Sequence, residues 1–409
     1  MTLLRIDKPG EYNLGEMTAG TVPIKDQVID VTAPDVTIIG LNGHGMRRAE
    51  SDPVGDNDWQ AFVRVRSTAA RCTIAESLLD DNDVISIRVD GAPNFTLENS
   101  EIMHTGCGVF FNGAAQSRIL NSAIHKIDRM LRNTPTAGDD TGAMCVAYKD
   151  APRNSTRHKL LGSYLGEAIS YSNDYGWNEG AGVEIYQASS IEVNGCVLLD
   201  LSVTTESGSK SPIQIYDIHF LNNYIGALEL IADEKYRRGL GLRPMQNSRI
   251  TGNRYFDLDH WDTVIGWGSQ TYGYGTNGDL VFSGNQHACT RNSKAYSYNG
   301  NGGTAYTVDP AQTILYGSAA QPLATQFRKE AIAKRDLILA GSGLGPSTPP
   351  VPVPPTDSAI LERIAALEAG LKAEESARMA ADSAEQQARV ATDIALDHRL
   401  DAIAGAAGG

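Results

Sequence analysis

The sequence predicts an all-β domain wound as a parallel β-solenoid, followed by a proline-rich linker and a C-terminal α-helical coiled coil. Three features lead to this prediction: a short phrase that recurs through the first 310 residues, a run of prolines near residue 350, and an alanine-rich repeat after it. We expect the β-solenoid at residues 1–310, a helical closing segment at 311–344, the linker at 345–357 and the coiled-coil helix at 358–405.

The recurring phrase is a short apolar segment that ends in Asn, Gly or Ser. "TLENSEI" from Thr96 is answered by "RILNSAI" from Arg118, 22 residues later. Each phrase is too short for a helix, and its last two residues tolerate left-handed turn geometry. We therefore expect a strand and a tight turn in every copy, with turn asparagines hydrogen-bonded from coil to coil. Related phrases begin at Thr73, Lys159, Ile191, His219, Arg249 and Val281.

A second short strand precedes most copies and a third follows them, as in "GVFFN" before Arg118 and "AIHKI" after it. Three strands per coil of about 22 residues are typical of a parallel β-solenoid, in which each coil buries its face against its neighbours. A β-sandwich or a propeller would need a regular set of two-residue hairpin loops, and the sequence has none.

Four longer inserts interrupt the pattern, at residues 128–142, 170–181, 202–211 and 231–239. We place each of them between the third strand of one coil and the strand that precedes the phrase of the next. Equivalent positions of successive coils lie on the same side of a solenoid, so inserts at the same position of each coil should stack into one wall. Variable loops on a rigid scaffold usually carry the functional site.

Outward-facing aromatic residues are expected beside this wall. If Val183 and Ile185 point inward, period-two alternation turns Glu184 and Tyr186 outward. Aromatic rings beside polar groups suit a sugar polymer, whereas tyrosines on an ordinary exposed sheet are the structural alternative. The predicted substrate-binding residues are Tyr148, Tyr186, Tyr216, Tyr171, Tyr175, Trp177, Gln214 and Arg238.

Two kinds of polysaccharide cleavage fit the ionisable residues near the wall. Hydrolysis needs two carboxyl groups across the glycosidic bond. β-Elimination needs a cation against a substrate carboxylate and a base for the adjacent proton. Neither set of residues has a diagnostic spacing, so both reactions stay open. The predicted catalytic residues are Asp139, Asp140 and Glu184 for hydrolysis, and Lys149, Lys235 and Arg237 for elimination, with Tyr148 or Tyr186 as proton carrier.

Composition argues against several kinds of partner. The formal charge is −14, with 49 acidic and 35 basic residues, and no basic cluster is dense enough for nucleic acid. No apolar run reaches membrane-spanning length, and the N-terminus lacks the pattern of a signal peptide. We therefore expect no nucleic-acid or membrane partner, and a protein that is made in the cytoplasm and does not leave it by the secretory route.

No cofactor is expected. The five cysteines lack CxxC or Cys/His metal spacing, so we expect small buried apolar residues instead of zinc ligands. "DDND" at Asp80–Asp83 could ligate calcium through oxygen atoms, but a solvated acidic turn is the favoured interpretation.

The chain changes character after residue 310. "PLATQFRKEAIAKRDLILAG" has a helical pattern and is expected to cover the open end of the solenoid, and "GPSTPPVPVPPTD" is a stiff spacer. "EESARMAADSA" is then answered by "EQQARVATDIA", an eleven-residue repeat that predicts a nearly straight or right-handed supercoil. A single alanine-rich helix would be only marginally stable, so self-association is expected.

Together these features resemble the phage tailspike and tail-fibre proteins built on the right-handed parallel β-helix, the fold of the pectate-lyase-like superfamily. The resemblance covers about residues 1–310 and rests on "IDKPGEYNL", "VIDVTAPDVTIIGLNGHG" and the turn phrases, and the eleven-residue repeat resembles trimeric fibre stalks. It implies a virion homotrimer that binds, and often cleaves, bacterial capsular or exopolysaccharide. It also implies other virion proteins as partners and release by host lysis. Because solenoid phrases begin almost at once, we expect attachment through the C-terminal helix.

No catalytic signature of that superfamily matches in full. "AGDDTG" resembles the paired aspartates of polygalacturonase-like hydrolases, but "GHG" at Gly43–Gly45 precedes it, which is the wrong order. "DIHF" at Asp217–Phe220 shares only its Asp and His with the Asp-Pro-His of alginate epimerases. Three hypotheses follow: a depolymerising virion spike or fibre, a virion protein that only binds glycan, and a bacterial polysaccharide lyase or epimerase with an oligomerisation tail. The absence of a secretion signal favours the first two.

Overall fold

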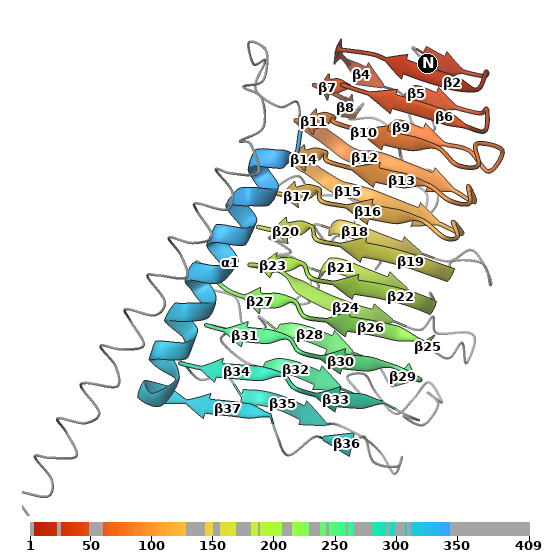
Figure 1. Cartoon of the computed structure of the whole chain (residues 1–409). Coiled ribbons are helices and arrows are strands. Elements are labelled where there is room, and N and C mark those ends of the chain that lie inside the picture. Colours follow the sequence, from red (N-terminus) through yellow and green to blue (C-terminus); the bar gives the residue numbers. More distant parts are fainter. Residues whose placement is uncertain are drawn as a thin grey trace, which may run out of the picture. The chain divides into compact units, whose positions relative to one another are not determined.

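The chain winds through three parallel β-sheets in turn, so that each coil of a parallel β-helix adds one short strand to each sheet (Figure 1). The computed structural model describes residues 4–22, 26–48, 60–127, 144–149, 156–168, 181–186, 189–206, 215–228, 238–242, 245–258, 261–265, 280–291, 294–298, 307–308 and 312–343. All of them belong to one compact unit, Met1–Pro346. The predicted linker at 345–357 and the coiled-coil helix at 358–405 lie outside the described residues.

Within the described residues each of these sheets has eleven strands, and two small two-stranded sheets accompany them. Sheet A contains β1 (Leu4–Ile6), β5 (Gln27–Val31), β9 (Ala61–Val65), β12 (Asn82–Asp90), β15 (Thr105–Asn112), β18 (Met144–Lys149), β21 (Ala181–Tyr186), β24 (Ser202–Glu206), β28 (Arg238–Leu242), β32 (Trp261–Ile265) and β35 (Lys294–Tyr298). Sheet B contains β2 (Gly10–Asn13), β6 (Val36–Ile39), β10 (Thr73–Ala75), β13 (Thr96–Glu98), β16 (Arg118–Leu120), β19 (Thr156–Leu161), β22 (Ser189–Asn194), β26 (Ile218–Leu221), β30 (Arg249–Thr251), β33 (Val281–Ser283) and β36 (Thr307–Val308). Sheet C contains β3 (Glu16–Thr18), β7 (Asn42–His44), β11 (Leu78–Asp80), β14 (Glu101–Met103), β17 (Ala123–His125), β20 (Tyr164–Gly166), β23 (Val197–Leu199), β27 (Tyr224–Gly226), β31 (Arg254–Phe256), β34 (Gln286–Cys289) and β37 (Thr313–Tyr316). The small sheets pair β4 (Thr21–Val22) with β8 (Arg47–Arg48), and β25 (Ile215–Tyr216) with β29 (Met245–Gln246).

The interior of the coils is filled by columns of similar apolar residues. In sheet A, Val109, Val146, Val183 and Val203 are Cα partners in successive strands, and all four are fully buried. β-Branched side chains pack well on pleated strands, and each fully buried valine contributes about 1.5–3 kcal/mol of hydrophobic stabilisation. One continuous apolar cluster runs through the coils, and the predicted parallel β-solenoid is confirmed.

Two-residue turns between sheets B and C explain the recurring phrase. The first turn residue is left-handed, with φ of 46° at Asn121, 58° at Gly162 and 55° at Asn222, a conformation that favours Asn and Gly. The second residue points inward, and its side chain accepts a hydrogen bond from a backbone N–H of the preceding coil. The residues that accept this bond are Ser77, Ser100, Ser122, Ser163, Asn223, Asn253 and Asn285. We call this column the turn ladder; Cys196 takes its place between Ser163 and Asn223.

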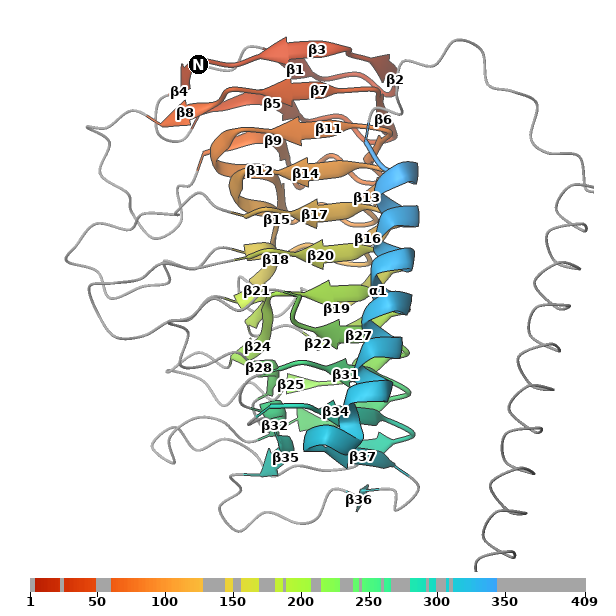
Figure 2. The same cartoon turned by 90° about the vertical axis from the view of Figure 1, so that its left-hand side faces the viewer.

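Helix α1 (Gln321–Gly341) follows β37 and a 3₁₀ turn, η2 (Gly317–Ala320), and runs lengthwise along sheet C (Figure 2). It contacts β20, β23, β27, β31 and β34. The prediction that this segment covers the open end of the solenoid is therefore wrong. The physical reason is an apolar outer face on sheet C, which a helix along the side can bury.

Both apolar and charged contacts hold α1 on sheet C. Phe327, which is 1% exposed, packs into a buried cluster with the outward-facing Tyr164, Val197, Leu199 and Phe256 of sheet C. At the margin of this cluster Arg328 Nη2 lies 2.7 Å from Asp257 Oδ2, and Tyr224 Oη donates a hydrogen bond of 2.7 Å to Glu330.

Three of the four inserts connect the sheets as expected. Those at 128–142, 170–181 and 231–239 each lead from a strand of sheet C to the next strand of sheet A. The insert at 202–211 does not, because Ser202–Glu206 is strand β24 of sheet A. Its polar residues resemble a loop, yet Val203 faces the core and is fully buried.

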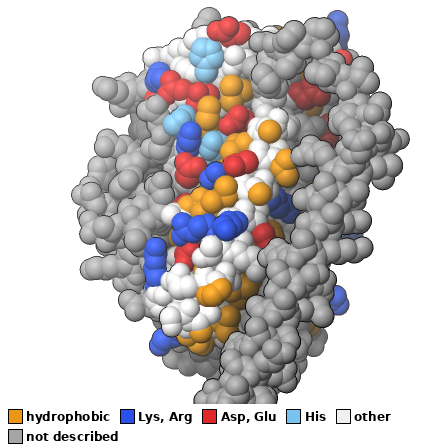
Figure 3. Space-filling model, turned by 60° about the vertical axis from the view of Figure 1, so that its left-hand side comes forward, with side chains coloured by type: hydrophobic (Ala, Val, Ile, Leu, Met, Phe, Trp, Pro, Cys, Tyr) orange, Lys and Arg blue, Asp and Glu red, His pale blue; other side chains and the backbone are white. Residues whose placement is uncertain are grey.

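On the face shown in Figure 3, basic and acidic side chains of the described residues are mixed. All five cysteines are buried and free, as expected for small apolar residues, and burial raises the pKa of Cys72 to about 12. Among the described residues no helix is long and apolar enough to span a membrane.

The turn ladder should be a main determinant of stability. Asn253 accepts hydrogen bonds from the backbone and side-chain nitrogens of Asn223, and it donates to the Phe220 carbonyl at 2.8 Å. Asn253→Ala leaves several buried polar groups unsatisfied, so we expect denaturant unfolding to show a loss of about 2–4 kcal/mol. The control Asn13→Ala, at an exposed strand end, should change stability by less than about 0.5 kcal/mol. Equal effects of the two substitutions would contradict the role of the ladder.

Helix α1 offers a matched pair of substitutions. Phe327→Ala opens a cavity between α1 and sheet C, and we expect it to lower the free energy of unfolding by about 3 kcal/mol. Leu337→Ala removes an apolar side chain that is 75% exposed on the same helix, and should cost less than about 0.5 kcal/mol. Denaturant titration of both variants tests the packing; a neutral Phe327→Ala would show that α1 does not seal sheet C.

Candidate functional site

Most of the predicted site falls on segments outside the described residues. These are the predicted catalytic residues Asp139, Asp140, Lys235 and Arg237, and the predicted substrate-binding residues Tyr171, Tyr175, Trp177 and Gln214. Their roles stay predictions.

Four of the other predicted residues lie on strands of sheet A. Glu184 on β21 is the Cα partner of Ala147 and of Thr204, and it alternates with the inward Val183 and Ile185. It is only 5% exposed. Lys149 and Tyr186 are Cα partners at the ends of β18 and β21, and Arg238 begins β28 of the same sheet. Glu206, which the sequence analysis did not single out, is the next partner of Tyr186.

Tyr148 is not on this face. It is the Cα partner of the inward Ile185, and its side chain is fully buried in the core. Its ring stacks on Phe111 at 5.2 Å and lies 5.0 Å from the ring of His158, and burial raises the pKa of its phenol. The prediction of Tyr148 as a substrate-binding residue and proton carrier is therefore wrong. A shift of one residue in strand register moves a side chain to the other face of a sheet.

Tyr216, another predicted substrate-binding residue, does not lie in sheet A. It belongs to the short strand β25, which pairs with β29 and not with sheet A. Its side chain is exposed. The strand that follows β21 in sheet A is β24, so Tyr148, Tyr186 and Tyr216 do not form one row on the outer face of that sheet.

Nearer the N-terminus, sheet A carries a network of paired charges. Asp90 accepts hydrogen bonds from Arg64 Nε at 2.6 Å, Arg88 Nε at 2.8 Å and Asn112 Nδ2 at 2.9 Å. Burial alone would raise the pKa of Asp90, but Arg88, Asn112 and Arg64 outweigh it and hold this pKa below its usual value. Asp90 is thus ionised and supplied with donors, which fits a structural role beside the row that continues to Lys149.

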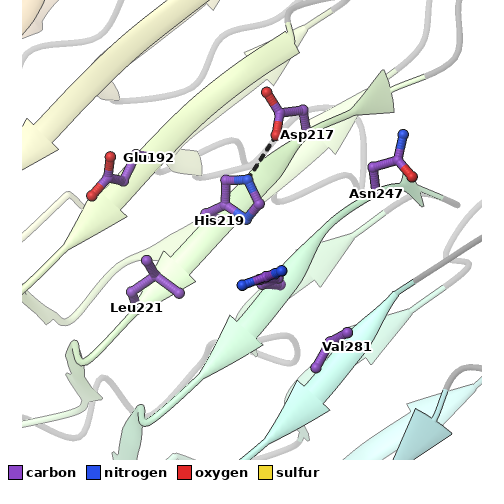
Figure 4. Close-up of a pocket in the computed structure, with 7 residues that line it drawn as sticks. Glu192, Asp217, His219, Leu221, Asn247 and Val281 are labelled. Atoms are coloured by element: carbon purple, nitrogen blue, oxygen red, sulfur yellow. Dashed lines mark hydrogen bonds and ion pairs between the residues drawn. The ribbon is translucent and has the colours of Figure 1, made fainter.

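A hollow of about 510 Å³ opens on the outer face of sheet B (Figure 4). Its central row crosses β22, β26, β30 and β33, where each lining residue is the Cα partner of the next. Asp217 and Asn247 stand in the left-handed turns that lead into β26 and β30, with φ of 61° and 50°. The full lining is Glu192, His219, Arg249 and Val281 in the row, with Asp217, Leu221 and Asn247.

Each acidic group of the hollow has a hydrogen-bond partner. His219 Nε2 lies 2.7 Å from Asp217 Oδ1, as the dashed line in Figure 4 marks. Glu192 accepts a hydrogen bond from Asn194 Nδ2 at 3.0 Å and pairs with Lys159 Nζ at 3.1 Å. The bond from Asn194, with help from Lys159, lowers the pKa of Glu192 in spite of partial burial. These contacts favour the ionised form of the Glu192 carboxyl group.

A row of ionisable residues at one phase of the coil indicates this hollow in the sequence, although none of them is among the predicted site residues. Arg118, Lys159, Glu192, His219 and Arg249 are successive Cα partners, so five ionisable residues share one phase of the coil. The phrase that begins at Ile191, "IEVNG", predicts a turn at Asn194–Gly195, and this alignment places Ile191 instead of Glu192 in the row. The left-handed residue is Gly195, and the following Cys196 points inward, which shifts that phrase by one residue.

No metal centre is evident in the described part of the chain. The described residues contain no group of three or more His, Cys, Asp or Glu side chains that could hold a metal ion. In the "DDND" turn, Asp81 forms an ion pair with Arg47, which engages one of the carboxylates considered for calcium.

Comparison with known proteins gives fold-level similarity to solved structures. No protein-family model matches the chain, and no curated protein does. The chain is similar to the A-module of mannuronan C-5 epimerase AlgE6 from Azotobacter vinelandii, at 11% identity and a TM-score of 0.43, over 76% of this chain and 87% of that chain. It is similar to alginate lyase AlyF-OU02 at 11% identity and a TM-score of 0.38, over 77% and 82%. It is also similar to the catalytic domain of a GH87 α-1,3-glucanase at 11% identity and a TM-score of 0.41, over 73% and 63%. All three are named as polysaccharide-acting enzymes, but the function of this chain has to be argued from its own residues.

The buried histidine beside Tyr148 predicts a pH dependence of stability. Burial lowers the pKa of His158 to about 3, against about 6.5 in an unfolded chain. The unfolded chain therefore binds the extra proton first, and the free energy of unfolding falls as the pH drops from about 6.5 towards 3, by up to about 1.4 kcal/mol per unit.

His158→Phe should remove this contribution, which urea unfolding between pH 4 and 6.5 would detect as a shallower slope. His44→Gln, which alters a more exposed histidine, serves as the control and should keep the wild-type slope. An unchanged slope in His158→Phe would mean that His158 does not enter the interior as the neutral form.

Proposed function

We propose that the protein binds and depolymerises a bacterial surface polysaccharide on the outer face of sheet A. The observation that carries this proposal is Glu184, an outward position on a rigid sheet whose carboxyl-bearing side chain is almost withdrawn from solvent. Buried ionisable groups on an outward face are typical of functional sites. Lys149, Tyr186 and Arg238 occupy the same sheet, and three of the inserts lead into it from sheet C.

The reaction that this arrangement favours is hydrolysis. Glu184 is one carboxyl group, and Glu206 supplies a second carboxyl-bearing position on the neighbouring strand, two residues beyond the partner of Glu184. In hydrolysis one carboxyl group protonates the glycosidic oxygen as the C–O bond breaks, while the other assists the attack of water or itself attacks the sugar. The alternative is β-elimination, in which Lys149 offsets a substrate carboxylate and Tyr186 carries the proton.

We also propose that the protein is part of a phage virion, as a homotrimeric spike or fibre. The support is the resemblance in the sequence and the eleven-residue repeat at 374–395, which suits a self-associating stalk. Its partners are then the host capsular or exopolysaccharide and other virion proteins, and the protein is released by lysis. A virion protein that only binds glycan, or a bacterial lyase or epimerase, is the alternative that the following experiment can favour.

The test is cleavage of a panel of bacterial capsular and exopolysaccharides by the purified full-length protein. We expect new reducing ends without the ultraviolet absorbance of an unsaturated product. Glu184→Gln should lower the rate by at least about 100-fold and leave binding in affinity electrophoresis unchanged. The control Glu11→Gln, at an exposed position of β2, should retain full activity.

Other outcomes are equally clear. Ultraviolet absorbance that rises in both the wild type and Glu184→Gln would replace hydrolysis with elimination and direct attention to Lys149 and Tyr186. Binding of one glycan without any product would show an adhesin and refute the catalytic proposal.

A further inference from the structure

We propose that the hollow on sheet B is a second, non-catalytic site that holds a carboxylate-bearing sugar residue of a polysaccharide. It lies on a different sheet from Glu184 and shares no residue with the site proposed there. That the ligand is a glycan rests on the proposed function, whereas the carboxylate is inferred from the hollow itself.

The first argument is the spare charge of Arg249. Glu192 and Asp217, the two carboxylates of the lining, are paired with Lys159 and His219. The side chain of Arg249 makes no hydrogen bond or ion pair with any residue that the structure describes, and it is exposed. Among the seven lining residues, the guanidinium is therefore the charge left for a ligand. Its planar fork of donors matches a carboxylate with two parallel hydrogen bonds.

The second argument is the shape and polarity around that guanidinium. Asn247 stands in the turn before β30, and its amide makes no hydrogen bond among the described residues, so it can meet sugar hydroxyls as donor and acceptor. Leu221 and the exposed Val281 provide an apolar surface for the C–H groups of a sugar ring. A hollow with one unpaired cation, one amide and two aliphatic side chains thus fits an acidic sugar better than a neutral one.

The third argument separates binding from catalysis. His219 is the obvious proton carrier in the hollow, but its Nε2 is engaged by Asp217 at 2.7 Å. Its other nitrogen, Nδ1, is buried and has no hydrogen-bond partner. A general base must reach the substrate proton directly or through one water, and neither nitrogen is placed to do so. The hollow is therefore an anchoring site.

The chain provides a matched control for Arg249. Arg118 begins β16 as Arg249 begins β30, and both lie in the same outward row of sheet B, four strands apart. The side chain of Arg118 is also exposed and makes no hydrogen bond or ion pair with the described residues, but it does not line the hollow. Substituting each arginine by glutamine removes the same charge at the same phase of the coil.

The experiment measures binding of the full-length protein to polygalacturonate and alginate, each beside its carboxyl-reduced form, by affinity electrophoresis and calorimetry. The wild type should bind at least one native polymer and should lose about tenfold or more in affinity when that polymer is reduced. Arg249→Gln should show the same loss on the native polymer, and Arg118→Gln should stay within about twofold of the wild type. Thermal unfolding should be unchanged in both variants because both side chains are exposed.

Several results would overturn the proposal: equal losses in the two arginine variants, equal binding of native and reduced polymers, or no binding of either acidic polymer. Glu184→Gln is included to separate the two sites. If it loses binding while Arg249→Gln keeps it, polymer is held on sheet A alone and the anchoring site is refuted. If Arg249→Gln loses binding and no polymer is ever cleaved, the anchoring site stands and the proposed catalytic function fails.

Discussion

The solenoid depends above all on the hydrogen bonds of the turn ladder between sheets B and C. At the steps of the ladder other than the one occupied by Cys196, a backbone N–H of one coil donates to the side chain of the equivalent residue in the next, with serine in the first coils and asparagine in the last. An unsatisfied buried N–H would cost about 1–3 kcal/mol per coil. Because the ladder fixes how coils stack, it also fixes which side chains share a row on every outer face.

Both candidate sites are consequences of that stacking. Glu192, His219 and Arg249 are about thirty residues apart in the chain, yet each is the Cα partner of the next. Neighbouring strands lie about 4.8 Å apart, so a row of outward side chains forms a regular array along the solenoid. On sheet A the stacking of coils makes Lys149 and Tyr186 Cα partners in neighbouring strands. A rigid scaffold of this kind holds functional groups in place without the ordering that a mobile loop would require.

What the sequence predicted well is what local geometry decides. In the pairs Asn121–Ser122 and Gly252–Asn253 the first residue adopts the left-handed conformation and the second points inward. This two-residue pattern is visible in the sequence, and it predicts the turn of each coil. Two features depend on the register between strands: which face of sheet A Tyr148 points to, and that Ser202–Glu206 is a strand of this sheet. The sequence of one strand does not contain this register. The position of α1 depends on the outer face of sheet C, to which Val197 and Leu199 belong. Together with the inward Leu198 they form a continuous apolar segment in the sequence. Such runs show burial on both faces but do not show what covers the outer one.

Electrostatics links the two faces of the molecule. With a formal charge of −14, the protein as a whole repels an acidic polymer, but salt screens this repulsion beyond about 8 Å at physiological ionic strength. Recognition must then come from contacts within that distance. On sheet B the carboxylates of the hollow are engaged by Lys159 and His219, and the side chain of Arg249 pairs with neither of them. On sheet A, Arg64 and Arg88 compensate the charge of the ionised Asp90 carboxylate. A negative net charge combined with a local cationic group is what the proposed anchoring of a polyanion at a defined position requires, because it disfavours diffuse association elsewhere.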